Sequence, residues 1–202
     1  MKLLHIDSSA LGENSVSRRL SGEIAGRLKA LHPVTDVVYH DLGRELPPHL
    51  TGTVLAALSG SQVQSQILQP EIDASRAYIE ELISADIVVI GAPMYNFSIS
   101  SPLKAWIDRV VIAGKTFRYG EHGPEGLLAP GRKAYVASTR GGVYDSTDLV
   151  WLDHQESYLK AVLSFIGLSD ITFVRADGLS FGPQERADSI AGALTHIAAL
   201  PA

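Results

Sequence analysis

Runs of β-forming residues alternate with helical patterns along almost the whole of this 202-residue chain. Such alternation is typical of βαβ units, in which a crossover helix joins each strand to a parallel neighbour. The run Asp86–Gly91 is apolar between its ends, which indicates a central strand that is buried on both faces. We therefore predict an α/β fold with a doubly wound, five-stranded parallel sheet and helices on both faces. The predicted strands are Leu3–Ile6, Val34–Tyr39, Asp86–Gly91, Lys133–Ser138 and Ile171–Val174.

Between these runs, apolar residues recur with helical spacing. The pair Ser101-Pro102 is typical of a helix start, with Ser101 as the N-cap and Pro102 as the first helical residue. Gly114 is expected to end that helix. The other predicted helices contain Leu20 to Leu31, Ile72–Ile83, Leu152–Ile166 and the residues from Pro183 onward.

The length favours a single domain over residues 1–202, because domains commonly have about 100–200 residues. Hydrophobic residues make up 46% of the chain and charged residues 19%, a balance that supports a sizeable core. Two segments fit the alternation poorly and resemble insertions. Residues 43–70 predict an irregular excursion with a short helix, which covers the active site or a dimer boundary. Residues 115–131 are rich in glycine and predict a loop or small hairpin.

Charge and composition exclude several classes of function. Lysine and arginine total 17 against 22 aspartates and glutamates, whereas nucleic-acid binders more often carry a basic excess. The chain has no cysteine, so any redox chemistry must come from a cofactor rather than from thiols or iron–sulfur ligands. His5 and Asp7 interrupt the first apolar run too early for a secretory signal. We expect a cytoplasmic protein that binds neither nucleic acid nor membrane.

Open α/β sheets bind ligands beyond the carboxyl ends of their strands. After the first predicted strand, residues 8–17 contain four serines and lead directly into a helix. Hydroxyls and free backbone N–H groups at a helix start favour an anion. Helix capping alone would need only one serine, so the loop predicts a cradle around a phosphate. The chain has neither G-x-G-x-x-G nor G-x-x-x-x-G-K-[ST], which disfavours tight NAD or ATP binding there.

Two further loops follow the third and fourth predicted strands. Residues 93–98 read Pro-Met-Tyr-Asn-Phe-Ser, and exposed aromatic residues in such a loop suggest that they cover a flat apolar ligand. Residues 139–144 contain Gly141-Gly142, which lets backbone N–H groups approach a ligand closely. Local packing and an ordinary turn are the alternatives for each loop alone. Together the three loops predict a ligand with a phosphate and a planar heterocycle, for which flavin mononucleotide (FMN) is the natural candidate.

The chain resembles the FMN-dependent NADH-azoreductases, also called NADH:quinone oxidoreductases, which have a flavodoxin-like fold. The resemblance implies a two-step, ping-pong reaction in which NADH reduces FMN and a quinone or azo compound then takes the electrons. It also implies a homodimer with the flavin near the subunit boundary, and it assigns no protein side chain as a general acid or base. It extends over essentially the whole chain and is carried by Pro93–Ser98, Leu103–Val110, Ala113–Phe117, Gly123-Pro124 and Arg140-Gly141-Gly142.

The same resemblance implies the roles of individual residues. Relative to the family, Thr139 replaces a common serine and keeps its hydroxyl, whereas Ser100-Ser101-Pro102 lacks an earlier proline, which is expected to shift the loop beside the flavin. Tyr119 and Phe165 would help to shape the substrate space. The implied FMN-binding residues are Ser9, Ser15, Val16 and Ser17 at the phosphate, Met94, Tyr95, Asn96 and Phe97 along the isoalloxazine ring, and Thr139, Arg140, Gly141 and Gly142 at its polar edge.

Other patterns point to different functions. The stretch Gly178–Gly182 matches a nucleophile elbow, with Asp188 and His196 in hydrolase order, but both of these would lie on one short helix. Asp153-His154 with Glu156 is expected to be a polar helix start, and no metal site is predicted. The main alternative is a flavodoxin-like FMN electron carrier without NADH turnover, although the two insertion-like segments favour an enzyme.

The choice between NADH and NADPH stays open at this point. A preference for NADPH would need an arginine near the ribose, where it could pair with the 2′-phosphate. Arg118 and Arg132 are the arginines considered for that role.

Overall fold

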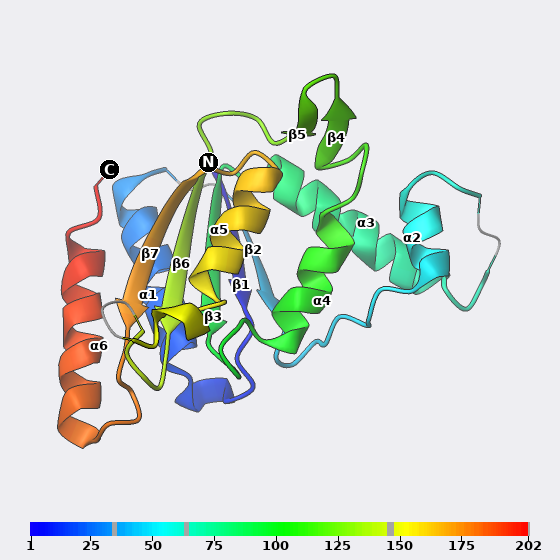
Figure 1. Cartoon of the computed structure of the whole chain (residues 1–202). Coiled ribbons are helices and arrows are strands. Elements are labelled where there is room, and N and C mark those ends of the chain that lie inside the picture. Colours follow the sequence, from blue (N-terminus) through cyan, green and yellow to red (C-terminus); the bar gives the residue numbers. More distant parts are fainter. Residues whose placement is uncertain (34–35, 63–64, 145–147, 202) are drawn as a thin grey trace.

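The computed structural model describes residues 1–33, 36–62, 65–144 and 148–201. Five parallel strands form its main sheet, in the order β2-β1-β3-β6-β7 (Figure 1). The chain steps from β1 to one side with β2 and then returns to the other side with β3. This switch point, between β1 and β3, is where open α/β sheets bind ligands. The strands are β1 (Lys2–Asp7), β2 (Asp36–Asp41), β3 (Ile87–Pro93), β6 (Lys133–Thr139) and β7 (Asp170–Ala176).

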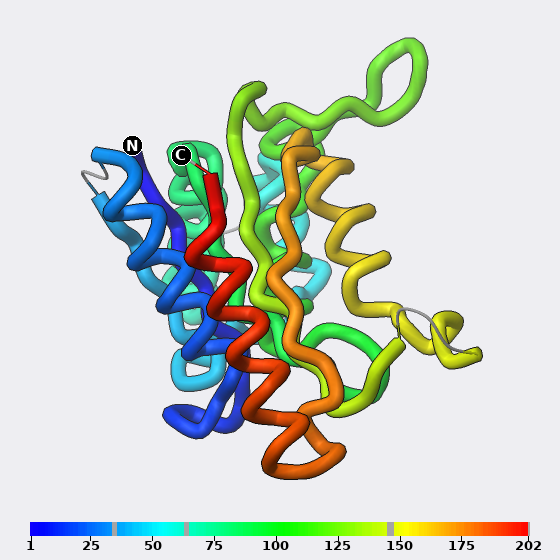
Figure 2. The backbone as a smooth tube through the Cα atoms, turned by 90° about the vertical axis from the view of Figure 1, so that its left-hand side faces the viewer, coloured from blue at the N-terminus to red at the C-terminus, as the bar shows by residue number. Residues whose placement is uncertain are grey.

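Helices cover both faces of the sheet (Figures 1 and 2). One layer contains α1 and α6, and the other contains α3, α4 and α5, with α2 packed on α3. The α-helices are α1 (Val16–Leu31), α2 (Gly52–Leu58), α3 (Gln69–Ser84), α4 (Ser101–Val110), α5 (Glu156–Phe165) and α6 (Pro183–Ala198); short 3₁₀ helices are η1 (Gly12–Asn14) and η2 (Val150–Leu152). None of the described helices is long and apolar enough to cross a membrane.

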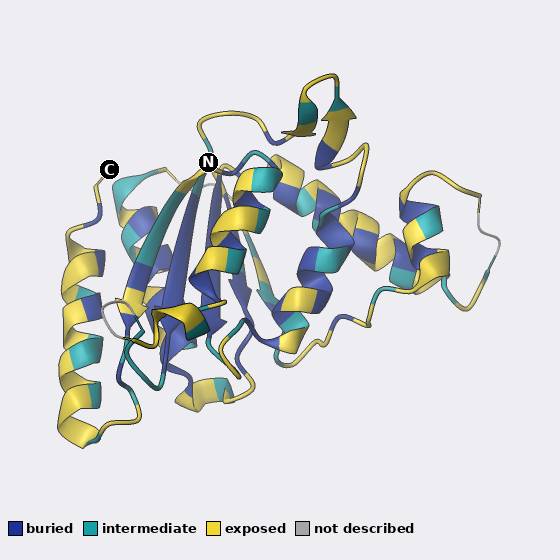
Figure 3. Ribbon diagram, in the orientation of Figure 1, coloured by how far each residue is buried: buried dark blue, intermediate teal, exposed yellow. Residues whose placement is uncertain are grey.

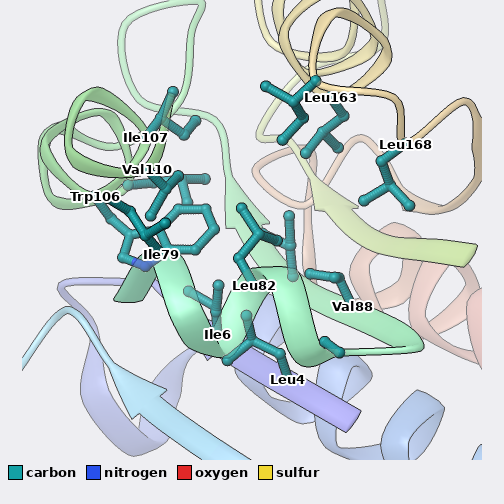
Figure 4. Close-up of a cluster of buried hydrophobic side chains, with 14 of the residues drawn as sticks. Leu4, Ile6, Ile79, Leu82, Val88, Trp106, Ile107, Val110, Leu163 and Leu168 are labelled. Carbon is teal, nitrogen blue, oxygen red and sulfur yellow. The ribbon is translucent and has the colours of Figure 1, made fainter. Parts of the chain in front are cut away.

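The two faces of the sheet bury separate apolar clusters. Every residue of β3 is buried, as the sequence predicts for the central strand (Figure 3). On one face, Leu82 of α3, Trp106 of α4 and Leu163 of α5 pack over Leu4 and Val88 (Figure 4). On the other face, α1 and α6 contribute the cluster. The paired cores keep the strands in register, and they thereby fix where the loops at the carboxyl edge lie.

The predicted strands are confirmed, whereas some helix ends need correction. Residues 34–35, at the start of the second predicted strand, lie outside the described residues. Ser100, rather than Ser101, caps α4, because its Oγ accepts the Leu103 N–H at 3.4 Å. That helix ends at Val110 and not at Gly114. The Thr116 hydroxyl donates a hydrogen bond of 2.6 Å to the Val110 carbonyl, in place of the next backbone N–H of a continued helix.

The start of α5 is also corrected, from Leu152 to Glu156. Leu152 belongs to η2, and Asp153 separates the two elements. The Asp153 carboxylate accepts the backbone N–H groups of Gln155 at 3.0 Å and Glu156 at 3.2 Å. This confirms the interpretation of Asp153 as part of a polar helix start.

The two insertion-like segments adopt the predicted kinds of structure. Residues 115–131 contain the antiparallel hairpin of β4 (Phe117–Gly120) and β5 (Gly123–Gly126), which projects from the body near the amino ends of the strands (Figure 2). The described part of residues 43–70 contains α2. Buried Arg109 of α4 fastens this segment, because its Nε donates to the Pro48 carbonyl at 2.8 Å and its Nη2 pairs with Glu71 at 2.5 Å.

Candidate functional site

Four loops meet at the carboxyl edge of the sheet. We call them the serine-rich loop (residues 8–17), the aromatic loop (93–98), the diglycine loop (139–144) and the Gly178–Gly182 loop. They follow β1, β3, β6 and β7, and parallel strands bring such loops to one edge (Figure 1). The first three are the loops in which the sequence predicts the ligand site.

The serine-rich loop places hydroxyl groups around the first turn of α1. Ser15 is the N-cap, and its Oγ accepts the Arg18 N–H at 3.2 Å. The Ser15 and Ser17 hydroxyls lie 3.0 Å apart and are both buried. The N–H groups of Val16 and Ser17 belong to the first turn, where no intrahelical acceptor exists. Hydroxyls and free N–H groups in this arrangement form a neutral cradle for an anion.

Beneath that loop, the Asp7 carboxylate at the end of β1 is buried and fully engaged. It accepts hydrogen bonds from Ser21 Oγ at 2.6 Å and from Tyr39 OH at 3.0 Å. A Cβ on Gly91 of the neighbouring strand would come within 2.3 Å of Asp7 Oδ1, so this position in β3 has no room for a side chain. Burial, followed by the Asp7 charge, raises the pKa of Tyr39 to about 12.

Arg18 ties the serine-rich loop to the end of β2. Both of its Nη atoms pair with Asp41 at 2.7 Å, and its Nε donates to the Gly12 carbonyl at 3.1 Å. Burial opposes the charge on Asp41, but the hydrogen bonds from Arg18 outweigh it and lower the pKa of that carboxyl. The charge on Arg18 is therefore neutralised within the protein, and its hydrogen bonds stabilise the conformation of the loop.

The aromatic loop is a two-residue hairpin at the end of β3. Tyr95 and Ser98 exchange backbone hydrogen bonds of 2.9 and 3.1 Å, and Asn96 and Phe97 lie between them with φ of +49° and +71°. Positive φ at both central residues is the geometry of a type I′ turn, which usually selects Asn-Gly. A phenylalanine in the left-handed region costs about 1–2 kcal/mol. The loop thus holds the Phe97 ring outward, 42% exposed, at an energetic cost.

Tyr95 joins the aromatic loop to the serine-rich loop. Its hydroxyl lies 3.2 Å from Ser9 Oγ and accepts the Ala10 N–H at 3.2 Å. At the other side, the Met94 N–H donates to the Thr139 carbonyl at 2.8 Å. The aromatic loop is therefore bonded to the loops on both sides of it.

The Gly178–Gly182 loop is hydrogen-bonded to the diglycine loop and stabilises it. The N–H groups of Gly178 and Ser180 donate to the carbonyls of Gly142 and Gly141, at 2.9 and 3.1 Å. A Cβ on Gly141 would lie 2.8 Å from Ser180 Oγ, so the close approach of the two loops requires glycine. These bonds explain the G-x-S-x-G pattern as a structural support. Asp188 bonds to Gln184 on α6 instead of completing a triad.

Arg140 lies between the diglycine loop and the interior. Its guanidinium is buried and pairs with Asp153 at 3.2 Å, with Asp177 at 3.5 Å and with Glu156. Its main-chain N–H and C=O are bonded to Ala176 and Leu179. The Arg140 side chain is thus engaged below the surface, and its contact with a flavin's polar edge stays a prediction.

Two hollows meet at the aromatic loop. A groove of about 150 Å³ runs between the serine-rich and diglycine loops, and a larger cavity of about 520 Å³ lies on the α4 side. Tyr95 lines both. The groove is lined by Ser9, Leu11, Asn14, Ser15, Val16, Pro93, Met94, Tyr95, Thr139, Arg140, Gly141, Leu179, Ser180 and Arg186. The cavity is lined by His49, Tyr95, Asn96, Ser98, Ile99, Ser101, Lys104, Ala105, Asp108 and Tyr158.

The groove brings together eight of the predicted FMN-binding residues, and Asn96 lines the cavity. Ser17, Phe97 and Gly142 line neither hollow. Tyr119 and Phe165 lie away from both: they flank Phe117, with ring centroids 5.5 and 4.6 Å from it, at the hairpin near the amino edge. Within one chain, therefore, these two residues do not shape the candidate site.

Sequence reasoning missed several groove residues, notably Ser180 and Arg186. Ser180 is the central residue of the Gly178–Gly182 pattern, which suggests a hydrolase rather than a cofactor site. No motif in the sequence around Arg186 indicates a ligand-binding role. The arginines considered for a 2′-phosphate lie elsewhere: Arg118 pairs with Glu125 in the hairpin, and Arg132 donates to the Leu82 and Ala85 carbonyls. No group of three potential metal ligands occurs in the part of the chain that the structure describes.

Comparisons with known proteins fit this geometry. A family model described as a flavodoxin-like fold matches residues 1–200. The chain belongs to this flavodoxin-like family. The FMN-dependent NADH:quinone oxidoreductase of Rhizobium meliloti is 52% identical over 198 residues, which are 98% of this chain and 96% of that protein. A relative of the same name from Bradyrhizobium is 51% identical over the full length of both chains.

A solved structure with a bound cofactor is also similar to this chain. It is a crystal structure of an FMN-dependent NADH-azoreductase from Bacillus anthracis in complex with FMN. That chain is 28% identical and superposes with a TM-score of 0.87, over 98% of this chain and 95% of its own. The chain therefore shares its overall fold with a protein that was crystallised in complex with FMN.

Proposed function

We propose that this protein is an FMN-dependent oxidoreductase that uses NADH to reduce quinones and azo compounds. The observation that carries the proposal is the pair of hollows that share Tyr95: a groove with an anion cradle at one end opens beside a cavity of about 520 Å³. Bound FMN supplies the redox chemistry, because it can take a hydride from NADH and pass two electrons to an acceptor. Relatives about 50% identical are named FMN-dependent NADH:quinone oxidoreductases, and the similar Bacillus anthracis structure is named an FMN-dependent NADH-azoreductase.

The groove fits FMN on the chemistry of its donors. Ser9 and Ser15, with the N–H groups of the first turn of α1, would hold the phosphate, and Ser17 would support them through its contact with the Ser15 hydroxyl. Met94 and Tyr95 form an apolar wall along the isoalloxazine ring, and Thr139 contributes a hydroxyl at its edge. The rigid bonds of the serine-rich loop mean that these donors are already in position before the cofactor binds, which favours affinity.

The cavity on the other side of Tyr95 admits the nicotinamide and then the acceptor in turn. Burial raises the pKa of Tyr158 above its ordinary value of 10.0, although nearby Lys104 opposes that shift. The phenol therefore keeps its proton at working pH and remains a hydrogen-bond donor. The Lys104 ammonium pairs with Asp108 at 2.6 Å, so this wall carries little net charge. Such a cavity suits flat, neutral acceptors.

We also propose that the protein works as a cytoplasmic homodimer. Tyr119 is 77% exposed on the projecting hairpin, and with Phe165 it lies at the far edge from the groove of its own chain. Both residues can shape substrate space only if a partner subunit presents them. Sedimentation velocity should give the mass of two chains, and a monomer that retains full activity would remove Tyr119 and Phe165 from the substrate site.

The direct test of the reaction is steady-state kinetics on the FMN-loaded protein. NADH oxidation is followed at several fixed concentrations of a benzoquinone, and then with an azo dye. A two-step transfer gives parallel lines in double-reciprocal plots. A protein that binds FMN tightly but oxidises NADH with neither acceptor would instead be a flavodoxin-like electron carrier.

A further inference from the structure

Arg186 is one of the groove residues that neither the sequence patterns nor the resemblance assigns to the cofactor. It lies in the first turn of α6, where its N–H donates to the Gly182 carbonyl at 3.0 Å. Arg186 lines the groove together with Ser15 and Val16 of the serine-rich loop and Ser180. A cationic residue therefore borders the same groove as the serine-rich loop.

The guanidinium of Arg186 has no ion pair and no hydrogen bond to any of the described residues. Three other arginines near the groove are engaged: Arg18 with Asp41, Arg44 with Glu13 at 2.6 Å, and Arg140 with its three carboxylates. Their charges are compensated inside the protein. Arg186 thus provides the one uncompensated positive charge among the described residues that line the groove.

The position of Arg186 is unfavourable unless an anion is nearby. The first turn of a helix carries the positive end of the helix dipole, which disfavours a cation there. Neither acidic residue on the same turns is ion-paired with Arg186 among the described contacts: Asp188 accepts a hydrogen bond from Gln184 Nε2 at 2.9 Å, and Glu185 turns back over Gly182. A bound dianion in the groove would pair with both the guanidinium and the dipole.

We propose that Arg186 is a cofactor-binding residue, whose guanidinium neutralises the FMN phosphate held by the serine-rich loop. This inference rests on the proposed function, because it requires FMN in the groove. It adds a charge to a cradle that otherwise consists of neutral hydroxyl and N–H donors. The same arginine also lines an adjoining cleft with Arg19 on α1, whose guanidinium likewise has no partner among the described residues. Arg19 does not line the groove and therefore provides a matched control.

The test compares FMN with riboflavin, which has the same ring but lacks the phosphate. The full-length apoprotein and its variants are titrated with each flavin, and binding is followed by quenching of flavin fluorescence. Loss of a partly exposed charge-assisted contact should weaken FMN binding by Arg186→Gln roughly five- to tenfold. Riboflavin binding should change by less than about twofold, since a neutral ligand gains little from the cation. Arg186→Lys should recover most of the FMN affinity, and Arg19→Gln should bind both flavins like the wild type.

Salt gives a second readout that a structural role would not move. Raising the ionic strength to about 1 M shortens the Debye length to about 3 Å and should weaken FMN binding more in the wild type than in Arg186→Gln. Equal FMN-to-riboflavin ratios in the wild type and Arg186→Gln would overturn the inference and leave the phosphate to neutral donors. A wild-type protein that binds neither flavin would instead contradict the proposed function.

Discussion

The serine-rich loop and the aromatic loop are neighbours at one sheet edge, but they are built in opposite ways. The serine-rich loop is held by buried, fully paired groups, in which Asp7, Arg18 and Asp41 each make short hydrogen bonds. The aromatic loop is also bonded to its neighbours through Met94 and Tyr95, but only two backbone bonds close its turn, which contains two left-handed residues and an exposed ring. Under the proposed function, the protein would hold the phosphate end of the cofactor rigidly, whereas the acceptor end would be less constrained.

The largest effect should follow from a negative charge in the cradle. Aspartate is as good an N-cap as serine, so Ser15→Asp should keep α1 intact. Its carboxylate would repel the FMN phosphate by about 4 kcal/mol, a roughly thousandfold loss of affinity. The neutral cap Ser15→Asn is the matched control. Flavin titration with FMN and riboflavin measures both variants, and unimpaired FMN binding by Ser15→Asp would place the phosphate elsewhere.

The next effect concerns the segment that borders the cavity. Arg109→Met leaves Glu71 without its buried partner and should cost about 3 kcal/mol of folding stability. It also frees the Pro48 carbonyl next to His49, so KM for the quinone should rise while FMN affinity stays unchanged. Denaturant unfolding and steady-state kinetics measure the two parts. A loss of FMN affinity equal to the rise in KM would show that the two regions are not independent.

A smaller effect should come from removing the backbone strain at Phe97 in the turn of the aromatic loop. Phe97→Gly removes the left-handed strain but adds entropy to the unfolded chain, for a net gain of about 0.5–1 kcal/mol. We expect Tm to rise by about 2 °C while acceptor KM increases. Phe181→Gly is the control, since Phe181 is also exposed but has no positive φ. A fall in Tm for Phe97→Gly would mean that the ring contributes packing that outweighs the strain.

The smallest effect is a pH dependence of the free energy of unfolding, which arises from Tyr39 beneath the serine-rich loop. The pKa of Tyr39, raised from 10.0 to about 12 by burial and by Asp7, means that the folded state holds this proton more tightly. The resulting stabilisation is complete below pH 10 and is lost as the pH rises towards 12. Tyr39→Phe should therefore show a shallower fall in the free energy of unfolding across this window. Parallel curves for the two proteins would remove Tyr39 from the network beneath the loop.

The two loops also differ in how well the sequence predicts them. The anion cradle could be predicted, because serines before a helical pattern act through local capping geometry. The type I′ turn at Asn96-Phe97 could not, since its sequence lacks the glycine that marks such turns. The buried position of the Arg140 guanidinium and the pairing of Ser180 with Gly141 depend on contacts between β6, β7 and α5. Those contacts arise only in the folded chain, and no single segment encodes them.

The most direct measurement of the central claim is the visible absorption spectrum of the FMN-loaded protein under anaerobic conditions. The account predicts that the flavin band bleaches on addition of NADH and returns when a quinone is added after the NADH is spent. A bound flavin that NADH fails to bleach would contradict the account and indicate an electron carrier.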